Sequence, residues 1–168
     1  MKGEVKAVER VRHITPEGQQ ALKNELNFLW KVQRPEVTRK VTEAAAMGDR
    51  SENAEYIYGK RQLRQIDSRV RFLSKRLESL VVVNRRPDAQ SRVYFGAWIH
   101  VEDDAGREQH YRIVGADEFD PARGYISIDA PLAKTLLGKR AGDEVRVTTP
   151  EGARHYLVLA VSYDPPAP

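Results

Sequence analysis

The chain has 168 residues, no cysteine, 31% charged residues and a formal net charge of +4. This length is enough for one or two domains with a buried core. The absence of cysteine excludes a disulfide framework, a cysteine zinc site and a thiol nucleophile. The four histidines lack metal-ligand spacing, and no apolar run approaches the ~18 residues of a membrane span. The N-terminus lacks the apolar stretch of a signal peptide, so we expect a cytoplasmic protein without membrane association.

Helical periodicity dominates the first half of the chain, after a basic leader at residues 1–13 that we expect to be flexible. Thr15 is a candidate N-cap, and Pro16 fits the first helical position. The first helix is predicted to run toward Met47, and Pro35 should kink it or remove one hydrogen bond. Its apolar stripe consists of Leu22, Leu26, Leu29, Gln33, Val37, Val41 and Ala44.

A second helix is predicted from apolar residues that alternate at spacings of three and four. This pattern, sustained over about three heptads, is typical of a coiled-coil seam. One interpretation is a dimerisation coiled coil, but the tight turn after Met47 favours pairing within the chain. We therefore predict an antiparallel coiled-coil hairpin over residues 14–84, with its tip at residues 47–56, and a monomeric protein. The seam residues are Tyr56, Gly59, Leu63, Ile66, Val70, Leu73, Leu77 and Leu80.

A polar linker at residues 85–92, which contains Pro87, ends the helical periodicity. Residues 93–164 then show the period of two that is typical of strands. Strands are predicted at residues 92–101, 108–114, 124–128, 143–149 and 154–163, with a short helix between Pro131 and Gly138. The prediction is an α+β protein: a helical hairpin followed by a small antiparallel sheet domain with one short helix.

Charge is divided unevenly between the two predicted domains. Residues 1–86 contain 19 Lys and Arg against 11 Asp and Glu, whereas residues 87–168 contain 9 against 13. The basic half suits nucleic acid, although a solvated helical face is the commoner explanation of such a charge. One sign dominates the second helix from Lys60 to Arg76, where Asp67 is the one acid against seven basic residues. We therefore favour sequence-independent, salt-sensitive phosphate contact by Lys60, Arg61, Arg64, Arg69, Arg71, Lys75 and Arg76.

The predicted tip, MGDRSENAEY, places three carboxylates around Arg50. Ser51 is a natural N-cap, which would leave Asp49 just outside the second helix and Glu52 in its first turn. Acids near a helix N-terminus are common, so capping alone accounts for one or two of them. Alternatively, Asp49 and Glu52 point together off the end of the hairpin as oxygen ligands for Mg²⁺. Two carboxylates are too few to hold Mg²⁺ tightly, so a partner and its substrate would have to complete such a site.

The residues GDRSENAEY resemble the tip signature of the bacterial Gre transcript-cleavage factors. The stretches LNFLWKVQRPEVT, YFGAWI, RIVGADEFD and YISIDAPLAKTLLGK resemble the GreB type more than the GreA type. The resemblance extends from about Ile14 to Tyr163. It implies that the sheet domain is similar in fold to FK506-binding proteins, and that the chain binds RNA polymerase through its secondary channel.

The resemblance also implies the roles of individual residues. Asp49 and Glu52 match the family's catalytic acids, which help to hold a Mg²⁺ ion shared with the polymerase during hydrolysis of backtracked RNA. The matching polymerase-docking loop consists of Asp129, Ala130 and Pro131. The chain would be an accessory factor rather than an enzyme, with no metal bound by the isolated chain. Contact with the RNA 3′ end would fall to some of Arg50, Lys60, Arg61, Arg64, Arg69 and Arg71.

Two other functions remain open from the sequence. A non-catalytic secondary-channel modulator would bind the polymerase without supporting cleavage. A peptidyl-prolyl isomerase carried by the sheet domain belongs to another class, and fold alone does not license that activity. Glu55 also matches the family pattern, and helix capping explains it as well as a functional role does.

Overall fold

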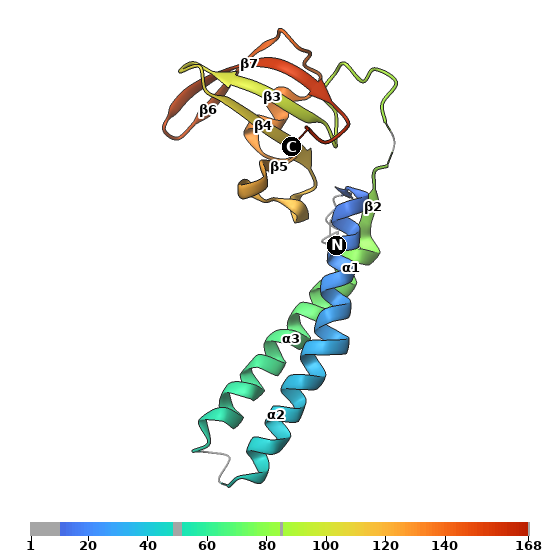
Figure 1. Cartoon of the computed structure of the whole chain (residues 1–168), viewed down its shortest axis with the longest axis vertical. Coiled ribbons are helices and arrows are strands. Elements are labelled where there is room, and N and C mark those ends of the chain that lie inside the picture. Colours follow the sequence, from blue (N-terminus) through green and yellow to red (C-terminus); the bar gives the residue numbers. More distant parts are fainter. Residues whose placement is uncertain (1–10, 49–51, 85, 168) are drawn as a thin grey trace, which may run out of the picture. The chain divides into compact units, whose positions relative to one another are not determined.

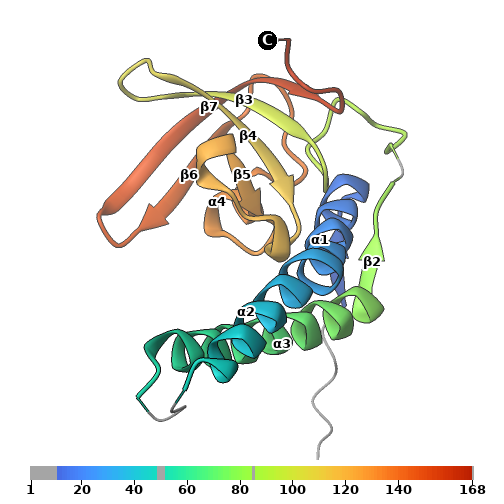
Figure 2. The ribbon, with the colours of Figure 1, turned by 60° about the horizontal axis from the view of Figure 1, so that its bottom comes forward.

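The computed structural model describes residues 11–48, 52–84 and 86–167. It divides into two compact units: the hairpin unit, Gln19–Leu80, and the globular unit, which contains the described residues up to Gly18 and from Val81 onward. Helices pair in the first unit, and a five-stranded sheet with one short α-helix forms the second (Figures 1 and 2). The predicted α+β fold class is confirmed.

The first predicted helix consists of three segments, α1 (Pro16–Phe28), the π-helical turn η1 (Leu29–Gln33) and α2 (Arg34–Ala46). The amide of Arg34 donates to the carbonyl of Leu29, five residues earlier. Pro35, which follows directly, has no N–H to donate, and its ring would clash with a carbonyl in a regular α-helical turn. The wider π turn accommodates the proline, so the expected perturbation takes the form of a π-bulge.

Helix α3 (Ala54–Ser79) runs antiparallel to α2, as both ribbon views show (Figures 1 and 2). Leu29 and Val37 pack with Ile66 and Leu73 in a common apolar cluster. The predicted seams therefore meet within one chain, as the tight turn indicated. The half-buried side chains that complete this cluster are Leu22, Leu26, Val41, Leu63 and Val70.

The two helices approach closely at Gly59, which is buried in α3. A methyl group at this position would lie 2.5 Å from Cγ2 of Val41. We expect Gly59→Ala to destabilise the hairpin by about 1–2 kcal/mol, because steric crowding outweighs the better helix propensity of alanine. The combination with Val41→Ala should cost less than the two single changes together. Urea unfolding of the four proteins measures this coupling, and strict additivity would contradict the packing.

A side-chain ion pair joins the two helices where Nε of Arg34 donates to Oδ1 of Asp67 over 2.8 Å. This hydrogen bond lowers the pKa of Asp67. The pair therefore stabilises the fold above the ordinary aspartate pKa of about 3.9, and that contribution is lost as the pH falls through the lower folded-state pKa. We expect the wild type to have a higher melting temperature than Asp67→Asn at pH 7. This difference in melting temperature should shrink below about pH 4. A difference that is constant with pH would contradict this linkage.

The sheet of the globular unit has the strand order β5-β4-β3-β7-β6. Strands β3 (Trp98–Asp103), β4 (Glu108–Val114), β6 (Glu144–Thr149) and β7 (Gly152–Ser162) pair antiparallel. Strand β5 (Tyr125–Ser127) is parallel to β4. Helix α4 (Pro131–Leu136) buries Ala133 and Leu136 in the same core as the sheet residues Ile99, Val101 and Val158.

The predicted strand at residues 92–101 was wrong in its first half. Strand β3 begins only at Trp98, because Gly96 adopts a positive φ of 85° and turns the chain. Val93 is nevertheless fully buried in the core. The apolar pattern thus predicted burial correctly, while Gly96 prevented a continuous strand.

Two short strands were not expected, β1 (Arg12–Ile14) and β2 (Leu80–Val82), which pair with each other. Strand β1 includes Arg12 and His13 of the expected flexible leader. Thr15 caps α1 as predicted, since its Oγ1 accepts from the amide of Gly18 over 3.1 Å.

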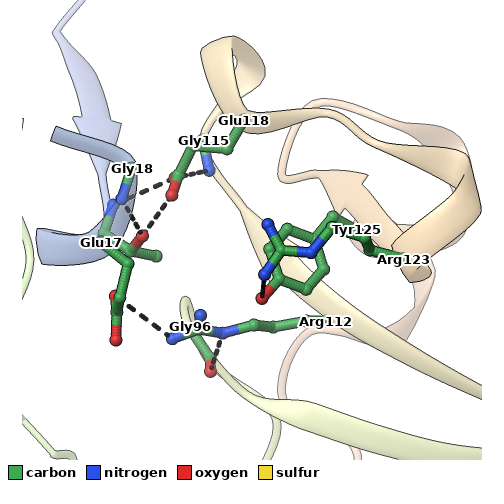
Figure 3. A network of polar contacts seen from close by, with 9 residues as sticks. Glu17, Gly18, Gly96, Arg112, Gly115, Glu118, Arg123 and Tyr125 are labelled. Carbon is green, nitrogen blue, oxygen red and sulfur yellow. Dashed lines mark hydrogen bonds and ion pairs between the residues drawn. The ribbon is translucent and has the colours of Figure 1, made fainter. Parts of the chain in front are cut away.

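A carboxylate of the globular unit holds the residues that follow β1 (Figure 3). Glu118 lies in η2 (Ala116–Glu118), and its Oε2 accepts from the amides of Thr15 (3.0 Å) and Gly115 (2.8 Å). Its other oxygen accepts from the Thr15 hydroxyl. We call these contacts among Thr15, Gly115 and Glu118 the Glu118 cluster.

Candidate functional site

The predicted tip begins where α2 ends and extends to the start of α3. Asn53 is the N-cap of α3, because its Oδ1 accepts from the amide of Tyr56 over 3.1 Å. Its Nδ2 donates to the carbonyl of Ala44 in the last turn of α2 over 2.7 Å. One side chain therefore satisfies a donor of one helix and an acceptor of the other.

This arrangement corrects the predicted cap. Helix α3 begins at Ala54, so Glu52 precedes the N-cap instead of lying in the first helical turn. Ser51, which was expected to be the cap, lies outside the described residues. Glu55 does lie in the first turn, where its charge complements the helix dipole.

Glu52 is exposed and makes no hydrogen bond or ion pair with the other described residues. Its partner in the predicted metal site, Asp49, lies outside the residues that the structure describes, as does Arg50. Within the described ranges, no group of three or more His, Asp or Glu residues could hold a metal ion. The described part of the tip thus presents two exposed carboxylates, Glu55 in the first turn of α3 and Glu52 before the N-cap, and that of Glu52 has no hydrogen-bond partner among the described residues.

The predicted nucleic-acid-binding residues on α3 are exposed, apart from Arg76, which is half-buried. Lys60, Arg64 and Arg71 are separated by intervals of four and seven, so they share one helical face. Arg71 also attracts Asp67 and helps to lower the pKa of that carboxyl group. Arg61 and Arg64 form no ion pair with another described residue. Arg69 differs from them, because its guanidinium binds both carboxylate oxygens of Glu25, at 2.7 and 3.0 Å.

A shallow hollow of about 570 Å³ lies on the surface of α3 among the basic side chains. It includes Phe72, whose exposed ring did not enter the predicted site. The sequence signal that could have found it is its spacing of three from Arg69 and four from Arg76, which places all three on one face. The lining residues are Arg61, Arg64, Gln65, Ser68, Arg69 and Phe72.

The predicted docking loop lies at the start of α4 in the globular unit. Asp129 and Pro131 are exposed, whereas Ala130 is half-buried and packs against the core. The loop is held by backbone contacts: the amide of Asp129 donates to Oγ of Ser127 (3.1 Å), and that of Ala130 donates to the Ser127 carbonyl (2.9 Å). An acid and a proline are therefore presented on a constrained turn.

None of the described helices combines the length and the apolar composition that crossing a membrane requires.

Comparisons with known proteins match nearly the whole chain. The family model "Transcription elongation factor, GreA/GreB, C-term" matches residues 88–163, and "Transcription elongation factor, N-terminal" of the same family matches residues 12–82. Transcription elongation factor GreB of Pasteurella multocida is 61% identical over 90% of this chain and 96% of its own length. The GreB protein of Pseudomonas aeruginosa is 59% identical over 92% of both chains.

A solved structure, the GreA factor homolog 1 (Gfh1) protein of Thermus thermophilus, is 24% identical over 90% of this chain and 99% of that chain, with a TM-score of 0.42. The family models and the GreB relatives, rather than this structural likeness, decide the assignment. The chain belongs to the GreA/GreB family of transcription elongation factors and is of the GreB type.

Proposed function

We propose that this transcription elongation factor binds RNA polymerase through its secondary channel and stimulates the polymerase's own Mg²⁺-dependent cleavage of backtracked RNA. The hairpin tip would reach the catalytic centre, and the chain would act as an accessory factor rather than as an enzyme. Cleavage would leave a new RNA 3′ end in register, from which elongation could resume.

The observation that carries the proposal is the position of Glu52. Capping was the competing explanation for the tip acids, but Asn53 performs that task for α3. Glu52 therefore has no structural partner among the described residues, and its exposed carboxylate is available to a ligand. A charged residue at the end of the hairpin, with no structural partner among the described residues, is suited to a task outside its own chain.

The chemistry of the tip suits a shared Mg²⁺ ion. Carboxylate oxygens are the ligands that this hard cation prefers, and it usually retains waters and binds through one or two protein carboxylates together with substrate phosphate. Glu52 and Asp49 would supply those carboxylates, and the polymerase would supply the others. In that position the ion would lower the pKa of a bound water that attacks the phosphodiester.

The remaining predicted residues would position the partner molecules. The extruded RNA 3′ end would follow the basic face formed by Lys60, Arg61, Arg64 and Arg71, and Arg50 would contribute near the tip. Arg69 would contribute less charge than predicted, because Glu25 already neutralises it. The constrained turn of Asp129, Ala130 and Pro131 would dock on the polymerase.

A cleavage assay on stalled, backtracked polymerase complexes tests this function, with the wild type beside the Asp49→Ala/Glu52→Ala variant. Loss of cleavage with retained polymerase binding supports the proposal. Cleavage that persists in the variant would leave a non-catalytic channel modulator as the function.

A further inference from the structure

We propose that Phe72, together with the guanidinium groups beside it, forms a stacking platform for an unpaired RNA base on the surface of α3. This inference deepens the proposed function, on which it rests for the source of the RNA. It adds base stacking, a different interaction, to phosphate contact by the basic residues.

The ring of Phe72 is arranged as a platform rather than as a core side chain. It is 41% exposed, although most apolar residues of α3 face the seam. The guanidinium carbon of Arg69 lies 5.1 Å from the ring centroid, and that of Arg76 lies 4.9 Å from it. Both distances are within the range of a cation–π contact.

Glu25 of α1 fixes one of these cations. Because its carboxylate binds Arg69 through two nitrogen atoms, the guanidinium plane is held in one orientation beside the ring. A preorganised planar group of this kind loses little conformational entropy when a ligand stacks on it. The aromatic ring and the guanidinium plane are both surfaces on which unpaired bases stack in RNA–protein complexes.

The charge around the platform selects a phosphate-bearing ligand. The hollow of about 570 Å³ that contains Phe72 is lined by Arg61, Arg64 and Arg69, and its other lining residues, Gln65 and Ser68, are uncharged. Among the lining arginines, Arg69 is neutralised by Glu25 of α1. Arg61 and Arg64 retain their charge for phosphates. A basic surface combined with a stacking ring is the usual design of a single-strand binding site.

The position of the platform fits a strand that runs along the hairpin. Phe72 lies eighteen residues beyond the first residue of α3, Ala54. This corresponds to about 27 Å of helix at 1.5 Å per residue. A base on Phe72 would therefore belong to the upstream part of an extruded strand, and its 3′ end could continue past Arg64 and Arg61 toward the tip.

Binding of short single-stranded RNA to the full chain tests the platform without polymerase. Fluorescence anisotropy at low salt should compare labelled oligoadenosine with an abasic strand that carries the same number of phosphates. We expect Phe72→Leu to weaken oligoadenosine binding about 5- to 100-fold and to leave abasic binding unchanged. Phe72→Trp should retain the wild-type preference for bases, because it keeps an aromatic face.

Phe119→Leu is the matched control, since Phe119 is a 61% exposed aromatic residue of the globular unit. It should leave both affinities unchanged, and circular dichroism should show wild-type helix content in all variants. Unchanged oligoadenosine binding by Phe72→Leu would overturn the proposal, as would equal weakening with the abasic strand. This measurement is independent of cleavage, so failure of the platform and failure of the proposed function are distinguishable.

Discussion

We expect the Asp49→Ala/Glu52→Ala variant to lose stimulated RNA cleavage by more than about 100-fold, equivalent to about 2.7 kcal/mol of transition-state stabilisation. The physical reason is that both candidate ligands of the shared ion are removed at once. Even residues that only hydrogen-bond to metal ligands typically contribute 10- to 100-fold to metal affinity or activity. Direct ligands should contribute at least as much. Cleavage product formed per minute in stalled complexes is the measurement.

The matched control removes two carboxylates elsewhere in the same hairpin. Glu36 and Glu43 lie on α2 and both bind Arg39, at 2.8 and 2.6 Å. Their joint replacement by alanine changes the net charge equally and should leave cleavage near the wild-type rate. Polymerase affinity should be the same for both double variants, because the proposed docking turn is intact. Equal cleavage loss in the two variants would mean that bulk charge, rather than the tip, is responsible.

We expect Gly115→Ala to cause the largest loss of stability in the globular unit, about 3 kcal/mol. Gly115 has φ −70° and ψ 160°, a conformation that alanine adopts freely, so backbone strain is not the cause. The cause is steric, because a methyl group there would lie 2.1 Å from the backbone carbonyl oxygen of His13. Urea unfolding followed by the fluorescence of Trp98, in a Trp30→Phe background, reports on this unit alone.

Gly18→Ala provides the comparison for this prediction. A methyl group at Gly18 would lie 2.0 Å from an oxygen of the Glu118 side chain, which can rotate away, whereas the His13 carbonyl cannot. Adding Glu118→Ala should therefore relieve the steric clash in Gly18→Ala but not in Gly115→Ala. Relief in both cases would show that the Glu118 carboxylate, and not the path of β1, limits the space at Gly115.

Local patterns in the sequence were sufficient for much of the fold. The spacing of three and four that includes Ile66 and Leu73 located the buried face of α3. The alternation through Ile99 and Val101 located the inner face of the sheet. Both patterns repeat every few residues, and each follows directly from the geometry of a helix or a strand.

Features that depend on distant contacts or on competing local choices were not predictable in the same way. Thr15 and Glu118 are separated by 103 positions, and nothing near either residue indicates their contact. Ser51 and Asn53 are both good N-cap residues by type, whereas the contacts that Asn53 makes with Tyr56 and Ala44 appear only in the fold. The role of Phe72 depends likewise on Glu25 of another helix, which orients the neighbouring Arg69.

The double hydrogen bonding of Asn53 also affects how the segment between Ala44 and Asn53 can evolve. Asn53 joins the end of α2 to the start of α3, and together with the apolar cluster between the helices it holds the hairpin without using the Glu52 side chain. Substitutions in this segment can therefore change its side-chain chemistry during evolution, while the two supporting helices keep their packing.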